Sequence, residues 1–202
     1  MSDDDARHRA KMEKRKAVQD AEVAEKTIEK GLLIVNTGPG KGKTTAALGL
    51  MLRALGHGWR VGVVQFIKGA RQTGERALIQ RHFAHLCQFH TMGEGFTWET
   101  QDRQRDIDAA QQAWDAAKDM IRSGDFRLIL CDELNIVLRY DYLDINEVVD
   151  FLKNEKPEDV HVVITGRNAK DELLEVADLV TDMTQVKHPF RSGVKPQEGI
   201  EF

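Results

Sequence analysis

The chain has little of what defines several large classes of protein. Its 202 residues include only 2 cysteines and 4 prolines, which excludes a disulfide-stapled or collagen-like protein. With 29 basic and 33 acidic residues, its formal net charge is -4, so it lacks the positive field that gathers nucleic acid. It also lacks an apolar run long enough to cross a membrane. We therefore expect a cytoplasmic protein with neither nucleic acid nor a membrane as a partner.

The cysteines and histidines do not form a metal site by their spacing. Cys87 and Cys131 lie 44 positions apart and belong to no C-x-x-C motif, so we expect buried thiols rather than a disulfide or metal ligands. The histidines match no metal-ligand template, and we assign none of them to catalysis. The remaining composition, 41% hydrophobic and 31% charged residues, is typical of a well-packed globular domain.

The composition changes after residue 30. Residues 1–30 carry eight basic and eight acidic side chains and too few apolar ones to build a core. They predict a charged N-terminal arm that is helical or disordered. Residues 31–202 form the expected single domain.

From Gly31 onward, short β-branched runs alternate with helical periods, a pattern typical of βαβ units and a mostly parallel, buried sheet. Expected helices cover 43–55, ended by Gly56, and 101–123, ended by Gly124. Asp144 and Glu147 resemble a capping box before a third helix. Strands are expected at 32–36, 61–67, 86–91, 126–131 and 160–165, with a weaker one at 179–184. The fold class is α/β, with three layers.

A glycine-rich loop lies between the first expected strand and the first expected helix. Its glycines let backbone N–H groups converge on an anion, Lys43 adds a positive charge, and the Thr44 hydroxyl suits Mg²⁺. The strict P-loop pattern requires glycine where this chain has Thr37, so the loop is a variant. A turn without a ligand is the alternative. The expected nucleotide-binding residues are Gly38, Pro39, Gly40, Lys41, Gly42, Lys43, Thr44 and Thr45.

A second signal of phosphate chemistry follows another expected strand. The apolar run 128–131 leads directly into Asp132 and Glu133, as in a Walker B segment. With Thr44, these two carboxylates are the expected metal ligands. The glycine-rich loop and this segment together indicate the three-layer fold of P-loop NTPases. Two carboxylates at a strand end can instead begin a solvated turn, and the residues alone leave that alternative open.

Two further segments follow expected strands, where ligand crevices of parallel sheets form. Phe96 and Trp98 would share one face of an extended segment, with core packing as the alternative. Thr165, Gly166 and Arg167 end another strand and offer a potential anion contact.

Taken together, residues 37–45, 63–69, 95–98, 132–134, 165–167 and 186–188 resemble the P-loop type of ATP:cob(I)alamin adenosyltransferase, the corrinoid adenosyltransferase of cobalamin biosynthesis. The resemblance spans nearly the whole chain. It implies an enzyme in which the Co(I) of a corrinoid attacks the 5′ carbon of ATP and inorganic triphosphate leaves.

The resemblance also implies roles for individual residues. Lys43 and Mg²⁺ (or Mn²⁺) would stabilise the negative charge on the departing triphosphate, and Arg53 on the following helix would contact phosphate. Phe96 and Trp98 would displace the lower axial ligand of cobalt and exclude water from the nucleophile. Lys43, Phe96 and Trp98 are therefore the expected catalytic residues.

The same resemblance implies an electron-donor flavoprotein as a partner and a homodimer whose arm covers the corrinoid site of the neighbouring subunit. Pro39 stands where the family usually has Asn; proline removes one backbone N–H, and a contact from the Asn side chain would be lost. Two alternative functions stay open. A P-loop kinase or ATPase would release ADP, and a corrinoid-binding escort would bind without chemistry.

Overall fold

The computed structural model describes residues 3–67, 73–91 and 102–201, and it divides the chain into two units, Met1–Lys30 and Gly31–Phe202. The first unit consists mainly of helix α1, Asp3–Ala24, and every side chain from Asp4 to Lys30 is exposed. Ion pairs one turn apart, such as Lys16 with Asp20 at 2.9 Å, follow its surface. Such pairs support a solvated helix by a few tenths of a kcal/mol each.

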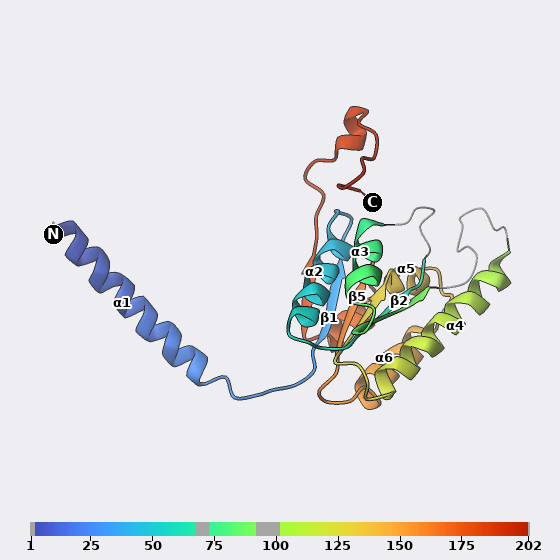
Figure 1. Ribbon diagram of the computed structural model, residues 1–202, viewed down its shortest axis with the longest axis horizontal. Helices are drawn as coiled ribbons and strands as arrows, with labels where there is room; N and C mark the ends of the chain where they lie inside the picture. Colours follow the sequence, from blue (N-terminus) through green and yellow to red (C-terminus); the bar gives the residue numbers. More distant parts are fainter. Residues whose placement is uncertain (1–2, 68–72, 92–101, 202) are drawn as a thin grey trace. The chain divides into compact units, whose positions relative to one another are not determined.

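The second unit is built on a six-stranded parallel sheet (Figure 1), in the order β3-β2-β4-β5-β1-β6. The strands are β1 Leu33–Thr37, β2 Val61–Gln65, β3 Cys87–Thr91, β4 Leu128–Asp132, β5 His161–Thr165 and β6 Leu179–Asp182. All six lie where β-branched and apolar runs predict them. The expected α/β class and parallel sheet are therefore confirmed.

Helices cover both faces of the sheet, so that the unit has three layers (Figure 1). On one face, α2 (Lys43–Gly56) and α3 (Gly74–His82) pack over one cluster of buried side chains. The other face carries α4 (Arg103–Arg122), α5 (Leu134–Arg139), α6 (Ile145–Asn154) and α7 (Asp171–Val176). Val63 belongs to the first cluster and Val64 to the second, because successive side chains of a strand point to opposite faces.

Two expected helix ends differ in detail from the structure. Gly56 is the last residue of α2 rather than its terminator, and the left-handed residue that turns the chain is Gly58, at φ 75°. Asp144 caps α6 by accepting the backbone N–H of Asn146 at 2.8 Å. Glu147 completes no capping box, because its carboxylate forms an ion pair with Lys118 on α4 instead.

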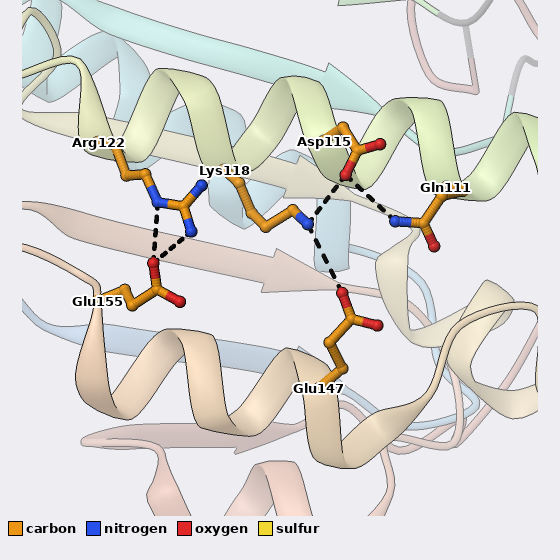
Figure 2. A network of polar contacts seen from close by, with 6 residues as sticks. All are labelled: Gln111, Asp115, Lys118, Arg122, Glu147 and Glu155. Carbon is orange, nitrogen blue, oxygen red and sulfur yellow. Dashed lines mark hydrogen bonds and ion pairs between the residues drawn. The ribbon is translucent and has the colours of Figure 1, made fainter.

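A polar network joins α4 to α6 across their exposed sides, as Figure 2 shows. Lys118 Nζ lies 2.9 Å from Asp115 and 3.6 Å from Glu147. Arg122 Nε donates to Glu155 at 3.0 Å, and the guanidinium lies over the ring of Phe151, 4.8 Å from its centroid. The helix that follows residues 92–101 is thereby tied to its neighbour.

The strand order brings three chain segments to the same edge of the sheet. Since β5 pairs with both β1 and β4 in parallel, the carboxyl ends of these three strands are adjacent. Thr37, Asp132 and Thr165 end them in turn. Ligand sites of parallel sheets lie at this edge. In the part of the chain that the structure describes, no helix is both long and apolar enough to cross a membrane.

Candidate functional site

The loop after β1 closes tightly on the segment that follows β6. Gly38 and Gly42 have left-handed backbones, at φ 96° and 107°, which non-glycine residues adopt only at a cost. Gly40 donates its N–H to the carbonyl oxygen of Met183 at 2.6 Å. A Cβ on Gly40 would lie 2.6 Å from that same oxygen. Both the backbone angles and this close approach therefore require glycine here.

Lys43 is the first residue of α2 and is buried although it is charged. Its ammonium group donates to the carbonyl oxygens of Gly38, at 2.9 Å, and Gly40. Burial lowers the pKa of Lys43, and the carboxylate of Glu133 partly opposes this. The positive charge is thus held at the centre of the loop, beside the N-terminus of α2, where anions bind.

Asp132 accepts two hydroxyl groups on a single oxygen. Thr44 donates to Oδ1 at 2.9 Å and Thr165 donates to the same atom at 2.8 Å. Asp132 is only 6% exposed. Burial raises the pKa of this carboxyl, and the hydroxyls of Thr165 and Thr44 partly lower it again. The phosphate loop, β4 and β5 are therefore joined at one buried oxygen atom.

Glu133 turns the chain out of β4 with a left-handed backbone, at φ 62°. Its N–H donates to Thr165 Oγ1 at 2.9 Å. Burial raises the pKa of the Glu133 carboxyl, the neighbouring Asp132 raises it further, and Lys43 and Arg167 oppose both effects. Two carboxyl groups and one lysine thus share a partly desolvated region.

Thr44, Asp132 and Glu133 line a cavity of about 820 Å³ at the carboxyl edge of the sheet. Polar residues of the loop and the Walker B segment form one part of its wall, and arginines from three other segments contribute positive charge. The lining residues that carry a charge or a hydroxyl group are Thr44, Thr45, Thr73, Glu75, Arg76, Asp132, Glu133, Arg139, Arg167 and Glu201. The volume is of the size that small-molecule ligands and cofactors occupy.

Mg²⁺ suits the oxygen donors at this edge. The Thr44 hydroxyl and the Asp132 carboxylate are hard ligands of the type that the ion prefers. Among the described residues, no group of three or more His, Cys, Asp or Glu side chains could hold a metal by itself. A magnesium ion here would take its remaining ligands from phosphate and water, which is how this ion usually binds beside nucleotides.

The structure brings most of the expected site residues together. The loop glycines, Lys41, Lys43 and Thr44 form one continuous segment beside Asp132 and Glu133, and Pro39 is exposed on that loop. Arg167, expected as an anion contact, lines the cavity. Phe96 and Trp98 lie outside the described residues.

Arg53 is the expected residue that the structure separates from the loop. It lies in the last turn of α2, ten residues after Lys43, which is about 15 Å along a helix axis. The described residues that line the cavity do not include it. The contact between Arg53 and phosphate therefore stays a prediction, and Arg53 lies apart from the residues that line this cavity.

Sequence reasoning missed other cavity residues. Arg76 and Arg139 come from α3 and α5, and Ile200 and Glu201 come from the carboxyl-terminal segment. Glu201 forms an ion pair with Lys41 of the phosphate loop. None of these four residues belongs to a motif, and only the folded arrangement brings them to the site.

Two family models and several curated relatives identify the same family. A family model described as "ATP:corrinoid adenosyltransferase BtuR/CobO/CobP" matches residues 29–202, and one described as "Cob(I)alamin adenosyltransferase N terminal" matches residues 1–23. Three curated relatives, each named "Corrinoid adenosyltransferase", align with 98% of this chain. The relative from Sinorhizobium sp is 61% identical over 199 residues, which cover 93% of its length. Those from Pseudomonas aeruginosa and Escherichia coli K12 are 50% and 46% identical over 198 residues, covering 97% and 99% of their lengths.

Proposed function

The chain belongs to the ATP:corrinoid adenosyltransferase family, and we propose that the cavity at the carboxyl edge of its sheet is where ATP and the corrinoid react. The protein is a transferase that moves the 5′-deoxyadenosyl group of ATP to the cobalt of a corrinoid, in cobalamin synthesis. The observation that carries the assignment to this cavity is the joining of Lys43, Thr44 and Asp132 around one loop of phosphate-binding type.

The reaction exchanges one bond for another. The electron pair of Co(I) forms a bond to the 5′ carbon, the bond between that carbon and its oxygen breaks, and triphosphate leaves with the bonding electrons. The cobalt is formally oxidised by two electrons. Because the cobalt itself supplies the electron pair, no side chain has to act as a general base.

The phosphate loop stabilises the charge that builds up on the triphosphate. Its N–H groups and the N-terminus of α2 provide donors that are fixed before the substrate arrives. The ammonium group of Lys43, held by the carbonyls of Gly38 and Gly40, transfers its hydrogen bonds to phosphate oxygens. Gly38, Pro39, Gly40, Lys41, Gly42, Lys43, Thr44 and Thr45 together form the proposed nucleotide site.

Magnesium or manganese is the proposed metal. Thr44, Asp132 and Glu133 are the residues that would hold it, directly or through water, and the ion supplies Lewis-acid stabilisation of the phosphates when bound. The hydroxyl proton of Thr44 is directed to Asp132, so the lone pairs of its oxygen are the part available to a cation. Asp132 thus acts on Thr44 as well as on the metal.

Other parts of the proposal rest on the family. Phe96 and Trp98 are proposed to displace the lower axial ligand of the corrinoid, and an electron-donor flavoprotein is proposed to supply the electron that reduces Co(II) to Co(I). A homodimer is also proposed, in which the arm of residues 1–30 covers the partner's corrinoid. A cytoplasmic location is proposed as well. The free, buried thiols of Cys87 and Cys131 suit a reducing compartment.

One anaerobic experiment tests the reaction at this site. The protein is mixed with MgATP and chemically reduced Co(I) cobalamin, the visible spectrum is followed, and the phosphate product is identified, with Lys43→Ala as the matched variant. We expect a light-sensitive adenosylcobalamin and free triphosphate from the unmodified chain and a large loss in the variant. ADP as the main product would indicate a kinase or ATPase, and tight corrinoid binding without turnover would indicate an escort.

A further inference from the structure

The residue that joins the two strand ends of the site is Thr165, the last residue of β5. We propose that Thr165 is a positioning residue, whose hydroxyl orients the Asp132 carboxylate and the Glu133 backbone so that the metal-dependent part of nucleotide binding is possible. The inference rests on the proposed function for the identity of the ligand, MgATP.

The hydrogen bonds of Thr165 leave its hydroxyl only one orientation. The N–H of Glu133 can only donate, so Oγ1 accepts there, at 2.9 Å. The single hydroxyl proton is then directed to Asp132 Oδ1, at 2.8 Å. Thr165 is completely buried, so water does not compete for either bond. Thr165 thus helps Thr44 to fix the direction of the Asp132 carboxylate, and it also holds the backbone N–H of Glu133, where the chain turns.

The turn that Thr165 holds is strained. Glu133 has φ 62°, a left-handed conformation that costs a side-chain-bearing residue about 1–2 kcal/mol and persists only where its surroundings enforce it. One further contact comes from the residue after β5, since Asn135 Nδ2 donates to the carbonyl of Gly166 at 3.0 Å. The two segments lie so close together that a Cβ on Gly166 would be 2.8 Å from Asn135 Cβ and 3.2 Å from Glu133 Oε2.

Thr165 affects the proposed metal site through Thr44. Asp132 Oδ1 is also the acceptor for the Thr44 hydroxyl, so a rotated carboxylate would release the Thr44 proton and change which lone pairs face the cavity. Groups that orient metal ligands in this way affect metal affinity by about 10–100-fold. The loop N–H groups and Lys43, which bind phosphate without metal, make no hydrogen bond to Thr165.

The test replaces Thr165 by Val, which has the same shape without the hydroxyl, and by Ser, which keeps the hydroxyl. ATP binding to each full-length variant is measured by calorimetry in MgCl₂ and in EDTA, and Mn²⁺ binding with ATP is followed by electron paramagnetic resonance. We expect the ratio of the two ATP affinities to fall by about tenfold or more in T165V and by less than about threefold in T165S. The affinity in EDTA should be unchanged in both.

Two results would overturn the inference. One is an unchanged ratio in T165V, including the case in which affinity falls equally in MgCl₂ and EDTA, and the other is an unmodified chain whose ATP affinity is the same with and without the metal. If T165V does not fold, Thr165→Ala takes its place with the same expectation. None of these binding measurements involves adenosyl transfer, so a failure of the proposed reaction is seen separately, in the product assay.

Discussion

Gly40 of the phosphate loop donates its backbone N–H to the carbonyl oxygen of Met183, at 2.6 Å. The register between β1 and β6 brings the two groups together, since Thr37 lies opposite Asp182 where both strands end, and Met183 is the next residue of the chain. The loop is therefore shaped from two sides, by Lys43 inside it and by the segment after β6 outside it. Both contacts end on backbone carbonyl oxygens, those of Gly38 and Gly40 within the loop and that of Met183 outside it.

Gly40→Ala should weaken ATP binding by at least about tenfold. The added Cβ would lie 2.6 Å from Met183 O and 2.7 Å from Thr184 O, both backbone atoms, so the loop itself has to shift and its N–H groups lose their common direction. Calorimetric titration with MgATP measures the effect.

Gly49→Ala is the matched control for that substitution. Gly49 lies inside α2, and a Cβ there has no neighbour within 4 Å. Alanine is favoured over glycine inside a helix by about 1 kcal/mol, so this variant should be slightly more stable and bind ATP normally. Equal affinities for the two variants would show that the close approach of Met183 does not shape the loop.

Local signals predicted most of the fold and the core of the site. Short β-branched runs marked the strands, and a glycine-rich turn followed by lysine and threonine identified the phosphate loop without any tertiary information. Such local signals could not predict the hydrogen bond between Thr165 and Asp132, because it depends on β5 lying between β1 and β4. Glu201 was missed for a similar reason, since its contact with Lys41 depends on the path of an irregular segment.

Asp132→Asn should raise the melting temperature at neutral pH while it reduces activity. Burial raises the pKa of Asp132, so the folded chain holds this proton more tightly than the unfolded chain. The resulting stabilisation is fully present below about pH 4, the unfolded pKa, and is lost as the pH rises through the folded pKa. The amide carries no charge to desolvate, so its stability advantage should grow with pH across that window, as thermal unfolding at several pH values would reveal.

Asp115→Asn should change the pH dependence of stability in the opposite direction. A hydrogen bond from Lys118 lowers the pKa of Asp115, so its contribution to stability is present above its unfolded pKa and is lost as the pH falls through the folded pKa. Asp115→Asn should therefore be neutral or slightly destabilising at pH 7. A gain in stability in both variants would point to a general charge effect instead of the burial of Asp132.

Arg122→Ala should destabilise the chain more than Glu155→Gln does. The second change removes only an exposed ion pair, worth about 0.5 kcal/mol. The first also removes the contact of the guanidinium with Phe151, which adds about 0.5–1 kcal/mol. Urea unfolding at low and high salt separates the two contributions, because salt screens the ion pair more strongly. If both variants lose the same free energy of unfolding at high salt, the contact of the Arg122 guanidinium with Phe151 contributes nothing to stability.

Glu201→Gln should tighten ATP binding by about two- to fivefold at low ionic strength. The Glu201 carboxylate lines the cavity and forms an ion pair with Lys41 of the phosphate loop. It therefore adds negative charge near the proposed triphosphate, and it competes with phosphate for the positive charge of Lys41. The Lys41 side chain is 48% exposed, which limits the contribution of the ion pair to about 1 kcal/mol or less.

Glu198→Gln, an exposed change in the same segment, is the control for Glu201→Gln and should bind ATP normally. Because salt screens exposed charges, the advantage of E201Q should shrink at high ionic strength. Weaker binding by E201Q would instead mean that Glu201 holds Lys41 in the position that phosphate needs.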